Sequence, residues 1–166
     1  MKEYIKNSFL VLLFIILNVS CSTTENKSIV LTTGLSSNPD EHRFGIEING
    51  NKLYYCEEIN TGKYRYFEGE VDNEILKELN FDDLFNKKIK RKNIVDAKLY
   101  RLDYLDKNKK LTIKFHLSEL EENDILIIEK FIELKEVSKF KEIKYHSFPS
   151  ELLLEKLPTP PYPNKE

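Results

Sequence analysis

The chain has 166 residues, with 26 Lys and Arg against 28 Asp and Glu, 40% hydrophobic residues and 33% charged residues. This composition excludes collagen-like, mucin-like and disulfide-dense proteins, and it is too apolar for a wholly disordered chain. The length fits one domain, and a net charge of −2 gives no global electrostatic reason to bind nucleic acid.

The N-terminal segment differs from the rest of the chain. Lys2 and Lys6 precede an unbroken apolar run over residues 9–17. As a helix this run would reach only about 14 Å, which is short of the roughly 30 Å hydrocarbon core of a membrane. A basic start, a short apolar stretch and a small-residue exit are typical of a secretory signal peptide.

The end of this segment, residues 17–21, resembles the lipobox of bacterial lipoproteins, with Ser20 directly before Cys21. The resemblance implies that a signal peptide over residues 1–20 is removed and that Cys21 becomes the lipid-bearing first residue. The family usually has Leu, Val or Ile three places before the cysteine, where this chain has Asn18. An ordinary cleaved signal peptide followed by an incidental cysteine is the alternative.

The same resemblance implies a location in a bacterial cell envelope. The lipid would hold the protein to the outer or inner membrane, with the domain in the periplasm or at the cell surface. Residues 21–27 are small and polar and suit a flexible tether. If Cys21 is acylated, Cys56 is the only thiol left, and we expect it to be a small buried hydrophobe rather than a reactive group.

The next part of the chain predicts a first block of antiparallel strands. β-branched residues and apolar side chains at every second position indicate strands over residues 28–33, 42–48, 53–59 and 64–71. The alternation places His42 on the apolar side of its strand. Asn49 and Gly50 predict a tight hairpin turn after the second strand, because this pair favours positive φ angles.

Helices and a second hairpin follow. Asp72 predicts an N-cap for a short helix, and Ser118 with Glu121 forms a candidate capping box for a long one. The remaining predicted elements are a helical turn over 81–86, strands over 97–105 and 111–117, a helix over 124–137, a strand over 142–148 and a helical turn over 151–157.

These elements predict an α+β fold, in which an antiparallel sheet made of two hairpin or meander blocks packs against one long and one short helix. The domain would span residues 28–157. A proline-rich tail over residues 158–166 cannot donate enough backbone hydrogen bonds to join a sheet and should be extended. The element order over residues 28–85 resembles small lipoprotein domains of bacterial envelopes. That resemblance rests on layout and carries over no active site.

Residue types that commonly perform catalysis or bind metals are scattered along the chain. His42, His116 and His146 are isolated, without the spacing of a metal site or a catalytic motif. Adjacent acidic pairs are better explained by helix capping and solubility than by a glycosidase site. We therefore assign no catalytic residue, no metal site and no cofactor.

Aromatic residues crowd around the third and fourth predicted strands. Tyrosine is favoured where one side of the ring is packed and the other recognises a ligand. The candidate binding face consists of Tyr54, Tyr55, Tyr64 and Tyr66. Its ligand would be a glycan, a peptide or an envelope protein. Half-exposed sheet tyrosines without any ligand are the alternative.

The densest charge cluster lies between the two blocks. It consists of Lys87, Lys88, Lys90, Arg91 and Lys92. On a membrane-tethered protein, each cation could contribute about 1 kcal/mol of attraction to an anionic lipid surface. A solvated connector is the alternative. Nucleic acid is not an expected partner, because the cluster lacks interleaved aromatic residues.

Taken together, these patterns predict an envelope-anchored protein that acts by binding. Its partners would be the membrane, through acylated Cys21, and an envelope protein, peptide or glycan. A small envelope hydrolase with scattered catalytic residues and a purely structural domain are the two alternatives.

Overall fold

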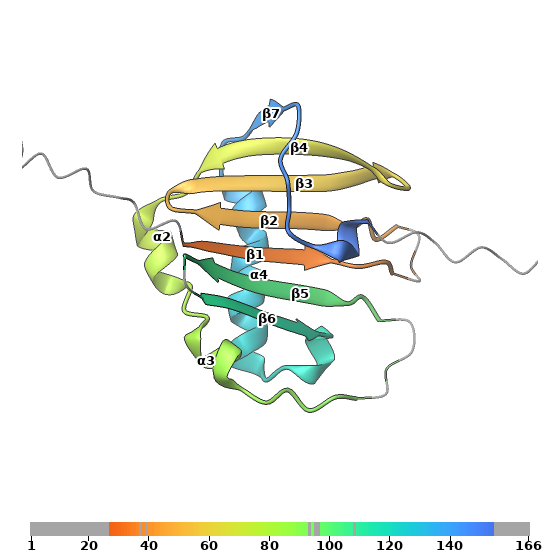
Figure 1. Cartoon of the computed structure of the whole chain (residues 1–166), viewed down its shortest axis with the longest axis vertical. Coiled ribbons are helices and arrows are strands. Elements are labelled where there is room, and N and C mark those ends of the chain that lie inside the picture. Colours follow the sequence, from red (N-terminus) through yellow and green to blue (C-terminus); the bar gives the residue numbers. More distant parts are fainter. Residues whose placement is uncertain are drawn as a thin grey trace, which may run out of the picture.

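The computed structural model describes residues 27–154, apart from residues 37, 39, 93, 95, 96 and 108. The predicted signal peptide, Cys21 and the proline-rich tail therefore lie outside the described residues. Within the described part, seven strands form one antiparallel sheet in the order β6-β5-β1-β2-β3-β4-β7 (Figure 1).

The described part of the chain is mainly β, with few helices. The strands are β1 (Ser28–Thr33), β2 (Phe44–Asn49), β3 (Lys52–Asn60), β4 (Lys63–Glu70), β5 (Tyr100–Asp106), β6 (Lys109–Phe115) and β7 (Lys141–Ile143). The helical elements are α2 (Asn73–Glu78), α3 (Asp82–Asn86), η1 (Leu117–Glu119), α4 (Glu122–Val137) and η2 (Glu151–Leu153). The predicted antiparallel sheet is confirmed. The predicted α+β class is confirmed only coarsely, because the helix content is small.

β1 joins the two predicted blocks into a single sheet. Leu31 pairs with Ile46 of β2 on one side and with Leu102 of β5 on the other. This register places the three apolar side chains on one face, and all three are fully buried. The first block alone would leave β1 as an unpaired edge, so the pairing with β5 removes a site of unwanted strand addition.

Helix α4 covers this face, which we call the helix face. It lies behind the sheet in Figure 1 and crosses the strands. Its apolar stripe of Ile128, Phe131 and Leu134 is buried in the core, as expected for an amphipathic helix on a sheet. No helix in the described part of the chain is long and apolar enough to cross a membrane.

Residues 144–154, which we call the crossing segment, cover part of the opposite face. After β7 the chain turns back over β3 and β2 and ends in η2 beside β1 (Figure 1). The predicted strand over residues 142–148 is therefore wrong beyond Ile143. In place of pairing with a strand, this segment bonds through side chains such as Ser150 to the face of the sheet. We call this second face the crossing face.

Two local details differ from the sequence prediction. The β2–β3 turn has Gly50 and Asn51 at its centre, one residue further along than expected, because Asn49 pairs with Lys52. The long helix begins after Glu121 without a side-chain cap, so the predicted capping box is wrong. The box forms instead on η1, between His116 and Glu119, because this 3-10 turn precedes the helix.

The turn at Gly50 generates a testable prediction. Gly50 has a φ of 63°, and a Cβ atom added there would contact nothing within 4 Å. Gly50→Val should therefore act through backbone strain alone and lower the free energy of unfolding by about 1–2 kcal/mol. Urea denaturation measures the loss. Gly50→Asn is the matched control, since Asn tolerates this conformation, and equal stability of all three proteins would contradict the turn assignment.

Candidate functional site

The crossing face carries charges that are buried and fully paired. Arg43 is 1% exposed and Glu58 is 8% exposed. Arg43 donates through Nε to Glu58 Oε2 at 2.9 Å and through Nη2 to Glu58 Oε1 at 2.5 Å. Its Nη1 donates to the backbone oxygen of Leu152 in η2 at 3.2 Å. The pair therefore ties β3 to the crossing segment.

A second buried charge lies further along the same face. Asp103 is fully buried and accepts hydrogen bonds from Arg101, at 2.7 and 2.9 Å, and from Thr112 at 2.5 Å. Glu151 of η2 pairs with both Arg101 and Lys114. None of the buried side-chain nitrogen or oxygen atoms of the described residues lacks a hydrogen-bond partner. The crossing segment thus completes the polar network beneath it.

Three further contacts hold the start and middle of the crossing segment. His146 stacks on the ring of Tyr54 with centroids 3.8 Å apart, and its Nε2 lies 2.9 Å from a carboxylate oxygen of Glu47. Phe148 passes so close to Gly45 that an added Cβ would lie 3.0 Å from its ring. The segment can approach β2 this closely because Gly45 has no side chain.

A cleft of about 640 Å³ opens between the crossing segment and the turn from β3 to β4. Its distinctive feature is a row of three tyrosines. Tyr64 and Tyr66 of β4 have ring centroids 6.4 Å apart, and Tyr145 of the crossing segment meets Tyr66 edge-on at 5.1 Å. Phe148 and Leu153 also line the cleft. We call this site, defined by these five residues, the tyrosine cleft.

The four tyrosines of the predicted binding face lie on opposite faces of the sheet. Tyr64 and Tyr66 line the tyrosine cleft, and Tyr54 lies beside it under His146. Tyr55 points to the helix face and packs into the core, because neighbouring residues on a strand point to opposite faces. Sequence reasoning missed Tyr145, which belonged to a predicted strand and had no local signal for its position.

The tyrosine cleft offers no unpaired buried cation or anion. Its one charged lining residue, Arg43, is committed to Glu58 and to the backbone of η2. The Tyr64 hydroxyl donates to the backbone oxygen of Leu153 at 2.8 Å, and burial raises the pKa of Tyr64 above its usual range. The neutral surface therefore suits a ligand without a formal charge that presents apolar area and hydrogen-bonding groups.

Cys56 lies on the crossing face opposite Gly45 of β2, as a buried small side chain. Its exposed fraction is zero, and burial raises the pKa of the thiol to about 12. The thiolate is the reactive form of cysteine, so the side chain is packed and unreactive in the folded protein, as the sequence led us to expect.

The Arg43–Glu58 pair makes stability depend on pH in a defined direction. Hydrogen bonding to Arg43 lowers the pKa of Glu58 from 4.5 to about 2. A lowered pKa means that the stabilisation is complete above pH 4.5 and is lost as the pH falls from about 4.5 through 2. The difference corresponds to about 3 kcal/mol.

We therefore expect Glu58→Gln to remove most of this acid sensitivity from the free energy of unfolding. Urea denaturation from about pH 6 to about pH 2, a range that spans the Glu58 transition, measures the effect. Glu129→Gln, at an exposed position on α4, is the matched control and should keep the native acid dependence. If the free energy of unfolding fell equally with pH in all three proteins, the role of the Arg43–Glu58 pair would be contradicted.

The three histidines occupy different settings. His42 is exposed, contrary to its predicted place on the apolar side, because β2 begins only at Phe44. The His116 ring lies 3.0 Å from the backbone oxygen of Lys98. His146 and its carboxylate partner have the arrangement of a base and its orienting acid, but the ring is packed by Tyr54 and by Phe148.

No cluster of His, Cys, Asp or Glu in the described part of the chain has the arrangement needed to hold a metal ion. A Ser-His or Cys-His catalytic arrangement would also require a serine or cysteine beside the His146 ring, and none of the described contacts of the ring is with such a residue. Its described contacts therefore favour a role in fixing the crossing segment.

Two cations of the basic cluster form ion pairs with acidic residues of η1 and of the start of α4. Lys87 lies 2.9 Å from Asp124 and 3.0 Å from Glu121, and Arg91 lies 3.3 Å from Glu119. Lys92 bonds to the same acidic region through its backbone and side chain. The remaining cations, Lys88 and Lys90, are exposed. Contact with an anionic membrane surface stays a prediction.

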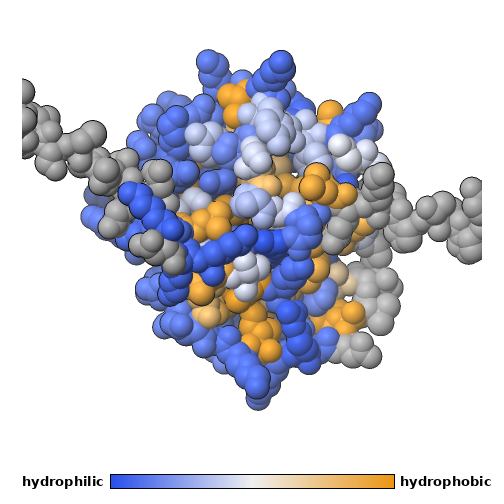
Figure 2. Space-filling view, in the orientation of Figure 1, coloured by the Kyte–Doolittle hydropathy of each residue, from blue (hydrophilic) through white to orange (hydrophobic). Residues whose placement is uncertain are grey.

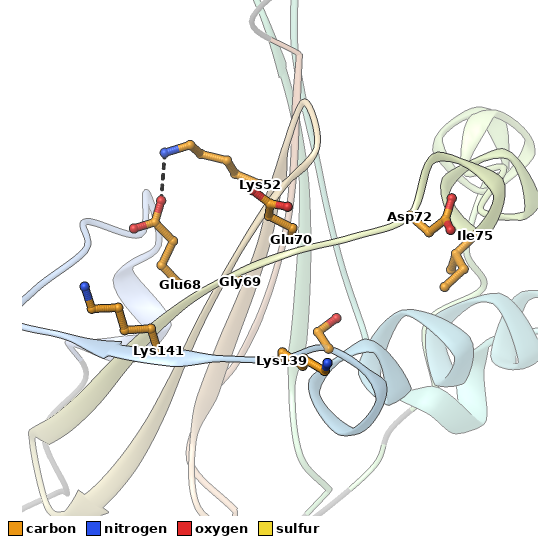
Figure 3. Close-up of a pocket in the computed structure, with 9 residues that line it drawn as sticks. Lys52, Glu68, Gly69, Glu70, Asp72, Ile75, Lys139 and Lys141 are labelled. Atoms are coloured by element: carbon orange, nitrogen blue, oxygen red, sulfur yellow. Dashed lines mark hydrogen bonds and ion pairs between the residues drawn. The ribbon is translucent and has the colours of Figure 1, made fainter.

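A second cleft, of about 600 Å³, lies where β4 leads into α2. Figure 3 shows Lys52 and Glu68 pointing toward one another, with Lys141 nearby and Asp72 across the cleft. The Lys52 and Glu68 groups are exposed and lie 2.7 Å apart. Acidic and basic side chains both line this cleft. It is therefore a solvated charged surface, and none of the charged side chains that line it is buried.

The outer surface over the crossing face is mostly hydrophilic, with hydrophobic residues gathered in patches (Figure 2). Tyr145 and Leu154, which both line the tyrosine cleft, are 65% and 79% exposed. Exposed apolar area beside a formed cleft is typical of a binding site. No protein-family model matches the chain, and no curated protein and no solved structure matches it either.

Proposed function

We propose that this chain is a bacterial envelope lipoprotein, tethered through Cys21, whose domain binds a partner through the tyrosine cleft. The anchor is supported by the lipobox-like residues 17–21 and the polar tether that follows. The binding role is supported above all by the row formed by Tyr64, Tyr66 and Tyr145.

The chemistry of the cleft favours recognition rather than catalysis. Tyrosine rings provide large contact area at a small cost in conformational entropy, because few bonds must be fixed. The rings are already oriented by neighbouring residues, since Tyr64 is held by the backbone of η2 and Tyr66 by Tyr145. A preorganised aromatic surface loses less freedom when a ligand binds.

The place of the cleft on the sheet also suits a tethered binding protein. The tether enters β1 at Ser28, which pairs with Asn49 at the turn between β2 and β3. The tyrosine cleft borders the opposite end of β3, at the β3–β4 turn containing Thr61 and Gly62. A lipid anchor at one end of the strands would therefore leave the cleft directed away from its point of attachment.

The anchor predicts a simple labelling result. In a bacterium that processes lipoproteins, the native chain should incorporate palmitate and Cys21→Ser should not. Cys56 is buried, so it offers no alternative acylation site, and Cys56→Ala is the matched control that should keep the label. Label in Cys21→Ser, or none in the native chain, would contradict the anchor.

The binding role predicts site-specific crosslinking in intact cells. A photoreactive residue at Ser147, which is exposed and lines the tyrosine cleft, should give a discrete adduct. Tyr145→Ala in the same protein should reduce that adduct by about tenfold, the effect of losing a central aromatic contact. A photoreactive residue at Leu126, which is 51% exposed on α4, is the matched control and should give no such adduct.

Identical adducts from Ser147 and Leu126, or an adduct that Tyr145→Ala leaves unchanged, would contradict the use of the cleft. His146→Gln tests the hydrolase alternative separately. An envelope hydrolase dependent on His146 would lose activity while its thermal unfolding stayed near that of the native chain.

A further inference from the structure

We propose that the tyrosine cleft takes a proline-rich segment in the polyproline II conformation, and that its occupant is this chain's own tail, Pro158 to Pro163. The inference deepens the proposed binding function and rests on it. In the resting protein the tail would occupy the site, and an external partner would have to displace it.

The chemistry of the cleft matches this class of ligand. Polyproline II segments dock into grooves lined by aromatic side chains, where proline rings pack between the rings of the groove. Tyr64, Tyr66 and Tyr145 form such a series, with successive centroids 6.4 Å and 5.1 Å apart. Leu153 and Phe148 add apolar area beside them.

The tail begins where it can reach the cleft. Leu154, the last described residue, is itself part of the cleft lining. Only residues 155–157 separate it from Pro158, and three residues can span about 10 Å. The segment from Pro158 to Pro163 would extend for about 19 Å as polyproline II.

The charge of the tail also matches that of the tyrosine cleft. The segment Pro158-Thr159-Pro160-Pro161-Tyr162-Pro163 has no charged side chain. The cleft is lined by one charged residue, Arg43, whose guanidinium is committed to Glu58. Neither partner would therefore leave a charge buried and unpaired on binding, which is the costly outcome for a polar interface.

Attachment in the same chain makes a weak interaction sufficient. A short flexible connection gives the tail an effective concentration in the millimolar range. If the isolated segment binds with a dissociation constant of about 0.1 mM, the attached tail would raise the apparent dissociation constant of an added ligand about tenfold. Because the proline segment is already extended, little further conformational entropy is lost on docking.

The test uses full-length protein in detergent and a fluorescent peptide of residues 157–166. The native chain is compared with a full-length variant carrying Pro158→Ala, Pro160→Ala, Pro161→Ala and Pro163→Ala. Fluorescence anisotropy should show that this tail variant binds the peptide about tenfold more tightly than the native chain, whose own tail competes. A peptide with the same four substitutions should not bind.

A cleft substitution locates the binding site. Tyr145→Ala in the tail variant should abolish peptide binding, and Leu126→Ala should leave it unchanged. Both residues are exposed, and thermal unfolding checks that each variant is folded. Equal affinity of the native chain and the tail variant, binding that survives Tyr145→Ala, or no peptide binding to the tail variant would overturn the inference.

Its failure is distinguishable from failure of the proposed function. If the tail variant binds no peptide while the crosslink from Ser147 still depends on Tyr145, the cleft binds another kind of ligand and only the inference about the tail is wrong. If neither the peptide nor the crosslink responds to Tyr145→Ala, both proposals are wrong.

Discussion

Burial of the Arg43–Glu58 pair constrains the whole crossing face. A buried charge is tolerated only when its partner and its remaining hydrogen bonds are in place. The Glu58 carboxylate accepts two hydrogen bonds from Arg43, and the backbone oxygen of Leu152 accepts a third. Glu58 also accepts a hydrogen bond from the backbone of Gly62 at 2.7 Å. The pair thereby holds the crossing segment and the β3–β4 turn at a common point.

The two faces of the sheet are therefore covered by different physical means. On the helix face, α4 buries apolar side chains such as Phe131, and this contact has little directional preference. On the crossing face, directional bonds such as those of Ser150 and Glu151 set the position of a segment that has almost no regular structure. A short irregular segment can hold its place there because its contacts are specific in geometry.

The tyrosine cleft follows from this arrangement. The crossing segment starts at the outer strand β7 and ends beside the central strand β1, so it covers the crossing face only along a diagonal path. Tyr64 and Tyr66 lie at the margin of that path, and Tyr145 completes their row from the segment itself. The site thus combines two residues of a single strand, β4, with residues of the crossing segment from the far end of the domain.

Local sequence patterns were sufficient for the strands of both blocks, for the N-cap Asp72 and for the long helix α4. They also carry the lipobox resemblance at Cys21, which depends on a short run of residues rather than on a fold. Each of these features involves residues close together in the chain. Periodicity and capping report such short-range relationships directly.

Only the tertiary structure decided how β1 pairs with β5, where the crossing segment lies and which tyrosines meet. Tyr66 and Tyr145 are separated by most of the domain in sequence, yet their rings are 5.1 Å apart. The alternating pattern of the sequence places Arg43 at a polar position of a strand. In the structure Arg43 is only 1% exposed, because η2 packs against it. Such contacts depend on the burial and pairing of groups brought together from distant segments, and no local pattern in the chain specifies them.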